Sequence, residues 1–118
     1  MDELLGRHVP YSAEAEQAVI GSMLIDPRCI SEVVDKLKPS DFYIQVNREI
    51  YETIFMMFSY SKTIDPVTVL DQMRLRGVYR DDSHEYLLEL MQVTPTAANV
   101  LKYAEIVRDR ALLRNLAA

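Results

Sequence analysis

Hydrophobic residues along this chain of 118 residues recur mainly at steps of three and four, the spacing that places them on one face of an α-helix. The clearest such segment is residues 46–60, whose shared apolar face holds Ile50, Tyr51, Ile54, Phe55 and Phe58. No segment alternates strictly between apolar and polar residues, as a half-buried strand would, and residues 67–69, the best strand candidate, fit a helix better. The pattern therefore predicts an all-α fold, a compact bundle of about six helices.

Helix start and stop signals divide this pattern into elements. Ser12, Asp26, Asp65 and Ser83 can each cap a helix, and a proline follows two of them at the first helical position, where its missing N–H costs nothing. Gly77 is expected to close the helix that begins after Asp65. A short helical turn is expected at residues 42–43, after a break at residues 38–41.

The helix predicted after Ser12 carries small residues on its apolar side. Ala15, Ala18, Gly21 and Ser22 follow each other at helical spacing. We expect this side to let another helix approach closely.

The last stretch predicts a long helix over residues 95–118, with Thr94 as its cap and Pro95 at its first position. Its apolar residues cover more than one face, and no glycine, asparagine or polar tail marks its end. We therefore expect a truncated helix, and the chain to be the N-terminal piece of a larger protein. The expected organisation is an N-terminal arm (1–11), a helical globular domain (12–94) and this helix (95–118).

Charge is unevenly distributed and narrows the choice of partners. The net charge is −5 overall, and residues 1–94 hold 9 Lys and Arg against 16 Asp and Glu, or −7, whereas residues 95–118 hold 4 against 2, or +2. An acidic globule repels a phosphate backbone, so direct binding of nucleic acid is not expected. No membrane span or secretory signal is visible, and a single cysteine, Cys29, suits a reducing cytoplasm.

The sequence shows no catalytic constellation, metal site or cofactor site. Its three glycines are far apart, which excludes a phosphate-binding loop, and His8 and His84 have no ligand at metal-site spacing. We expect Cys29 to be buried and inert. Helix dipoles account for Glu14 and Glu16 in the first turn of their helix.

Two interpretations of Tyr86 remain open. It neighbours inward-facing leucines, so it can be a residue at the edge of the core with its hydroxyl in water, or an anchor at a protein interface.

An alternative function is a small helical dimeric regulator that binds DNA through a helix-turn element. Residues 65–80 would form that element, and Arg74, Arg76 and Arg80 support it. The acidic balance of the globule argues against it.

Several short segments, in their order and spacing, resemble the N-terminal domain of the bacterial replicative DNA helicases, the DnaB family. The run SAEAEQAVIG (12–21) and the run PTAANV (95–100) are together highly specific, and the resemblance extends from about Val9 to Leu116. The segments that carry the rest of it are DFY (41–43), IDPVTV (64–69), YLLEL (86–90) and the pairs at 103–104 and 106–107.

This resemblance implies a hexameric, ATP-driven helicase whose motor, with its ATP and Mg sites, is absent from this chain. The family's N-terminal domain is a helical globule followed by a helical hairpin, and paired hairpins build a trimer of dimers. Primase docks on that collar through its C-terminal domain, and a helicase loader is a further candidate partner. For this chain, self-association as a dimer is expected, and the alternative to hairpin pairing is a dimer of globules or of swapped end helices.

The resemblance also implies site residues. Glu14 and Tyr86 match family positions linked to primase coupling. Residues 95–118 match the first hairpin helix, whose candidate subunit-interface residues are Val100, Leu101, Tyr103, Ala104, Val107, Ala111 and Leu112.

Overall fold

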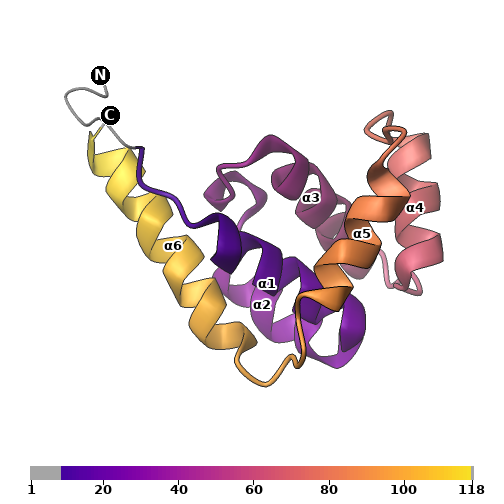
Figure 1. Ribbon diagram of the computed structural model, residues 1–118, viewed down its shortest axis with the longest axis horizontal. Helices are drawn as coiled ribbons and strands as arrows, with labels where there is room; N and C mark the ends of the chain where they lie inside the picture. The colour runs from indigo at the N-terminus through magenta and orange to yellow at the C-terminus, as the bar shows by residue number, and fades with distance from the viewer. Residues whose placement is uncertain (1–8, 118) are drawn as a thin grey trace.

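The computed structural model describes residues 9–117, which form six α-helices and two single-turn 3-10 helices without any strand (Figure 1). The prediction of an all-α fold with about six helices is confirmed. Residues 1–8 of the expected arm lie outside the described residues. The elements in chain order are α1 (Ala13–Ile25), η1 (Pro27–Cys29), α2 (Ile30–Lys36), η2 (Pro39–Asp41), α3 (Gln45–Ser59), α4 (Pro66–Leu75), α5 (Ser83–Gln92) and α6 (Val100–Ala117).

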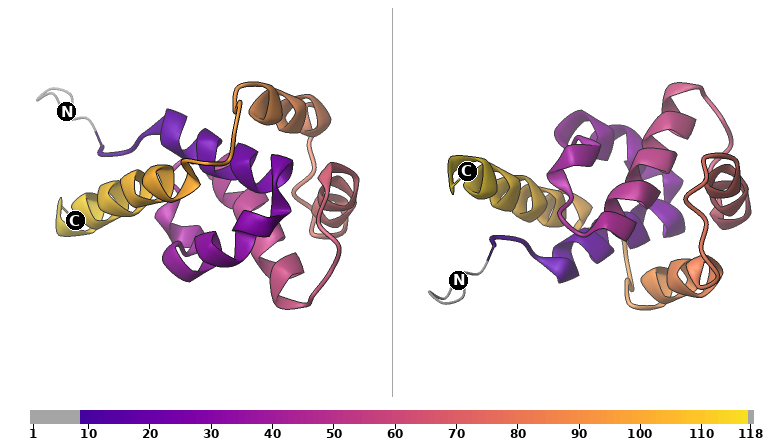
Figure 2. Two further views of the ribbon diagram at one scale, coloured as in Figure 1. Left: turned by 90° about the horizontal axis from the view of Figure 1, so that it is seen from below. Right: turned by 90° about the horizontal axis from the view of Figure 1, so that it is seen from above.

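Helix α1 is the centre of the arrangement. It packs against α6 on one side and against α5 on the other, and it also contacts α3 (Figures 1 and 2). Residues 19–24 are accordingly all buried. Helix α4 lies at the far end from α6 and packs against α3 and α5.

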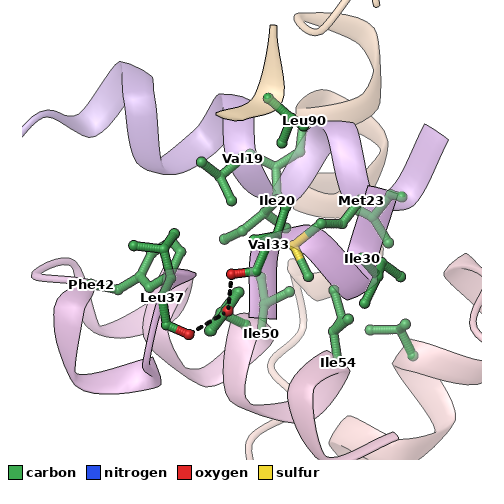
Figure 3. Close-up of a cluster of buried hydrophobic side chains, with 14 of the residues drawn as sticks. Val19, Ile20, Met23, Ile30, Val33, Leu37, Phe42, Ile50, Ile54 and Leu90 are labelled. Carbon is green, nitrogen blue, oxygen red and sulfur yellow. Dashed lines mark hydrogen bonds between the residues drawn. The ribbon is translucent and has the colours of Figure 1, made fainter. Parts of the chain in front are cut away.

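The core lies between α1, α2 and α3 (Figure 3). Val19, Ile20 and Met23 of α1 are fully buried there, and Tyr51 of α3 is buried with its phenol donating to the Leu37 carbonyl at 2.8 Å. Burying each of these aliphatic side chains contributes about 1.5–3 kcal/mol. This cluster fixes the three helices relative to one another.

Helix boundaries follow local chemistry where the chain caps itself. The Ser12 hydroxyl accepts from the Ala15 amide at 3.2 Å, and the Asp26 carboxylate accepts from the Arg28 amide at 3.2 Å. Asp65 accepts from the Thr68 amide at 2.8 Å, and Gly77 closes α4 with a positive φ of 75°. The predicted starts after Ser12, Asp26 and Asp65 and the predicted stop at Gly77 are confirmed.

Helix α6 begins at Val100, not at Pro95 as the cap signal predicts. The Thr94 hydroxyl donates to the Leu90 carbonyl at 2.8 Å, so it completes the end of α5 instead of capping α6. Residues 94–99 carry the chain from α5 on one side of α1 to α6 on the other (Figure 2).

Three smaller expectations are wrong. The single helical turn lies at η2 and not at residues 42–43, because Phe42 is extended and fully buried. Phe58 is 40% exposed, since the inward row of α3 continues from Ile54 to Met57. Ser83 does not cap α5 by its side chain, because its hydroxyl accepts from the Arg80 amide.

Candidate interaction surfaces

A groove of about 530 Å³ runs between the N-terminal half of α1 and the start of α6. Its walls are mainly apolar, with Val93, Tyr103 and Ile106 on the side of α6 and of the segment that precedes it. Glu14, exposed in the first turn of α1, lies on the opposite wall. The structure thus brings together a candidate primase contact, Glu14, and a candidate subunit contact, Tyr103.

Tyr86 on α5 is half-buried, and its hydroxyl points into the protein and not into water. The phenol donates to Oδ1 of Asn47 on α3. Burial raises the pKa of Tyr86, and hydrogen bonds with Gln17 and Asn47 act in the opposite direction. Gln17 also lines the groove, whereas Tyr86 does not.

A buried carboxylate stands at the centre of this polar network. Glu16, only 1% exposed, accepts from the Tyr43 amide at 2.7 Å and the Ile44 amide at 3.2 Å. It also accepts from Nδ2 of Asn47 at 3.0 Å. Ile44 is the residue before α3 and has no side-chain cap of its own, so Glu16 caps α3 from another helix.

The sequence analysis missed this role of Glu16, because the helix dipole already explained an acidic residue in the first turn of α1. A signal was present, because Glu16 is four and seven residues before Ile20 and Met23, on the buried row of α1. The network connects α1, α3 and α5 through Glu16, Asn47 and Tyr86.

The candidate subunit-interface residues divide into two groups. Val100, Ala104, Val107 and Ala111 are at most 4% exposed and belong to the inward face of α6, which packs on α1 and α2 of the same chain. In this structure their side chains are covered by their own chain, and their role at a subunit interface stays a prediction. Leu101 and Tyr103 are half-buried and Leu112 is 49% exposed, so these three keep accessible surface.

The arginines that support the DNA-binding alternative are engaged within the globule. Arg76 pairs with Glu52 at 2.7 Å and Arg80 with Glu49 at 2.6 Å. The Arg74 guanidinium lies 4.2 Å from the centre of the Tyr79 ring. Carboxylates of the same chain therefore balance the charges of Arg76 and Arg80, and Arg74 contacts an aromatic ring.

Among residues 9–117, no group of three His, Cys, Asp or Glu side chains is placed to hold a metal ion. His84 is exposed at the start of α5, and His8 lies outside the described residues. No helix in the described part of the chain is both long and apolar enough to cross a membrane.

Cys29 is buried, and desolvation together with the nearby Asp26 raises the pKa of its thiol to about 11. The reactive thiolate is therefore scarce near neutral pH. We expect alkylation by iodoacetamide at pH 8 to be about a hundredfold slower than for a free cysteine of pKa about 8.5, with a rate that still rises between pH 9 and 10. Mass spectrometry of timed samples measures this rate, and alkylation as fast as in a model peptide would contradict it.

The fold and these surfaces first define a class, an all-helical domain whose exposed features suit protein contacts. The family model described as "DnaB-like helicase N terminal domain" matches residues 8–109. The chain therefore belongs to the family of DnaB-like helicase N-terminal domains. An unrelated DNA-binding regulator is excluded by this membership.

Curated relatives are replicative DNA helicases DnaB of much greater length. The protein of Leifsonia xyli subsp. xyli (strain CTCB07) is 37% identical over 111 residues, which are 93% of this chain and 24% of that protein. The protein of Pasteurella multocida (strain Pm70) is 38% identical over 91% of this chain and 23% of its own length. The protein of Mycobacterium leprae (strain TN) is 37% identical over 97% of this chain and 19% of its own length. The chain thus spans about a quarter or less of each relative.

Solved structures of N-terminal domains share the fold. The crystal structure of the N-terminal domain of DnaB helicase from Mycobacterium tuberculosis superposes with a TM-score of 0.88 at 37% identity, over 93% of this chain and 79% of that one. The N-terminal domain of DnaB helicase from Helicobacter pylori, described with its interactions with primase, gives a TM-score of 0.74 at 23% identity, over 87% and 80% of the two chains. The latter likeness supports the fold alone.

Proposed function

We propose that this chain serves a replicative DNA helicase as its non-motor domain, which supports assembly of the hexamer and docks primase. The observation that carries the docking proposal is the groove between α1 and α6. Its apolar wall at Val93, Tyr103 and Ile106 faces the exposed carboxylate of Glu14, a combination that suits an apolar anchor with a basic neighbour on a protein partner. The interactions of the Helicobacter pylori domain with primase support the same partner class.

The same proposal also covers the motor domain, the cellular location, a second partner and self-association. ATP and Mg act in a motor domain outside these residues, and the protein works in the bacterial cytoplasm, where a helicase loader is a second candidate partner. Self-association uses the outer face of α6, where Leu112 and Leu113 are each 49% exposed and Leu116 is 84% exposed. The proposed self-association surface is therefore the outer face of α6 and not its inward face.

A calorimetric titration with the C-terminal helicase-binding domain of primase from the same organism tests the docking proposal. We expect saturable binding that Glu14→Ala weakens about tenfold, because the basic group of primase at the edge of the apolar contact loses its carboxylate partner. Tyr86→Ala is expected to weaken binding as well, since it removes half-exposed aromatic surface and frees Asn47. Far-ultraviolet circular dichroism verifies that each variant is folded.

The matched control is Asp71→Ala. Asp71 is an exposed carboxylate on α4, at the end of the molecule farthest from α6 (Figure 1). It should leave the affinity unchanged. Equal affinities for the wild type, Glu14→Ala and Tyr86→Ala would place the docking surface elsewhere, and no binding at all would contradict docking by this domain alone.

A further inference from the structure

Two arginines bond the C-terminal half of α6 to the globule: the exposed Arg108 donates to the Lys36 carbonyl at 3.1 Å, and Arg114, nearer the end, makes the more extensive contact. Arg114 donates from Nη1 to the Pro10 carbonyl at 2.8 Å and from Nη2 to the Asp41 carbonyl at 2.7 Å. Its guanidinium also lies 5.3 Å from the centre of the Tyr43 ring, which stacks on Tyr11 at 4.7 Å. One side chain thus connects α6 to segments that lie 104 and 73 residues away in the sequence.

The apolar contact beneath α6 is uneven along its length. Ala104 and Val107 are at most 1% exposed, but beyond Val107 the inward row holds only the methyl group of Ala111. Alanine offers little apolar surface, so attachment of the last turns depends on Arg114 more than on packing. The outward leucines of the same turns remain exposed.

The bonds of Arg114 are of a kind that can open. Both of these acceptors are backbone carbonyls, and the Asp41 carboxylate is turned away to accept from the Lys38 amide at 2.8 Å. The contact is only partly buried, so when the arginine leaves, water can form hydrogen bonds with both carbonyls and with the guanidinium. Local opening begins at elements with few buried apolar contacts and solvent-accessible hydrogen bonds.

We propose that Arg114 is a latch that holds the last turns of α6 and residues 10–11 closed on the globule. When the latch opens, α6 detaches from its C-terminal end as far as Val107, where the buried apolar row resumes. Opening changes the direction in which the end of α6 leaves the globule and exposes Ala111. The latch is a property of this chain and does not depend on primase docking.

Amide hydrogen exchange of the 118-residue chain, measured by NMR, tests the latch. In Arg114→Gln we expect the amides of residues 110–113 to exchange about tenfold faster, while those in the middle of α1 and α3 keep their rates. Arg114→Lys should give a smaller increase, because an ammonium group keeps the charge but lacks the planar fork that reaches two carbonyls. Lys102→Gln, which removes one exposed charge from the other end of α6, should change nothing.

Two results would overturn the proposal. Unchanged exchange at residues 110–113 in Arg114→Gln would mean that the arginine does not hold these turns. An equal increase in all helices would mean that Arg114 stabilises the whole fold and controls no local opening. If Arg114→Gln does not fold, Arg114→Lys decides between the same outcomes.

Discussion

Replacing Glu16 with alanine is expected to lower the free energy of unfolding by about 3 kcal/mol. The carboxylate is 1% exposed and accepts from three donors, the Tyr43 and Ile44 amides and the Asn47 side chain. Alanine leaves these donors without an acceptor at the start of α3, and each buried unpaired group costs about 1–3 kcal/mol. Water that enters the vacated space recovers part of this cost.

Chemical denaturation followed by circular dichroism measures the effect, and Glu14→Ala is the matched control. Glu14 lies two residues earlier on the same turn of α1 but is exposed, so its loss should change the free energy of unfolding by less than about 0.5 kcal/mol. Glu16→Gln should be intermediate, because an amide oxygen can accept while its NH₂ group faces other donors. If the two alanine variants unfold at the same denaturant concentration, the network does not stabilise the fold.

Helix boundaries set by near neighbours could be read from the sequence. The acceptors of Ser12 and Asp65 bond amides three residues away, and Gly77 supplies a backbone angle that the local turn requires. Such signals need no tertiary structure. They correctly predicted the starts of α1, η1 and α4 and the end of α4.

Residues that fit two structural roles could not be assigned to one of them from the sequence alone. Thr94 can cap a following helix or complete a preceding one, and the structure uses its hydroxyl for Leu90. Glu16 satisfies the dipole of its own helix, but its bonds reach residues 27 and 28 positions away. Only the packing of α1 against α3 brings those amides to the carboxylate.

The apolar row of α6 illustrates a different limit. Its spacing correctly predicts that Val100, Ala104 and Val107 are covered, because exposing such a row to water is unfavourable. The spacing contains no information on whether the cover comes from the same chain or from a second subunit. The structure supplies that answer with α1 and α2.

Gly21→Ala is expected to destabilise the fold by about 2 kcal/mol, although alanine is the better helix former by about 1 kcal/mol. A Cβ atom at this position would lie 2.5 Å from the Leu90 carbonyl oxygen and nearer still to Oγ1 of Thr94. This is the close approach of a second helix, α5, that the small residues of α1 predict. The backbone of α5 would have to move away from α1 and would loosen the contacts of Leu90.

The double variant Gly21→Ala/Thr94→Ala separates this steric effect from a change in helix propensity. Thr94→Ala removes Oγ1, the nearest of the three contacting atoms, but keeps Cβ of residue 94 and leaves the Leu90 carbonyl in place. The double variant should therefore be more stable than the sum of the two single variants by about 1 kcal/mol, a coupling that denaturant titration of all four proteins measures. Two results would contradict this: strictly additive changes in the free energy of unfolding, or a Gly21→Ala variant more stable than the wild type. Either result would show that α5 moves away from residue 21 without loss of stability, so that close packing of α5 does not require glycine there.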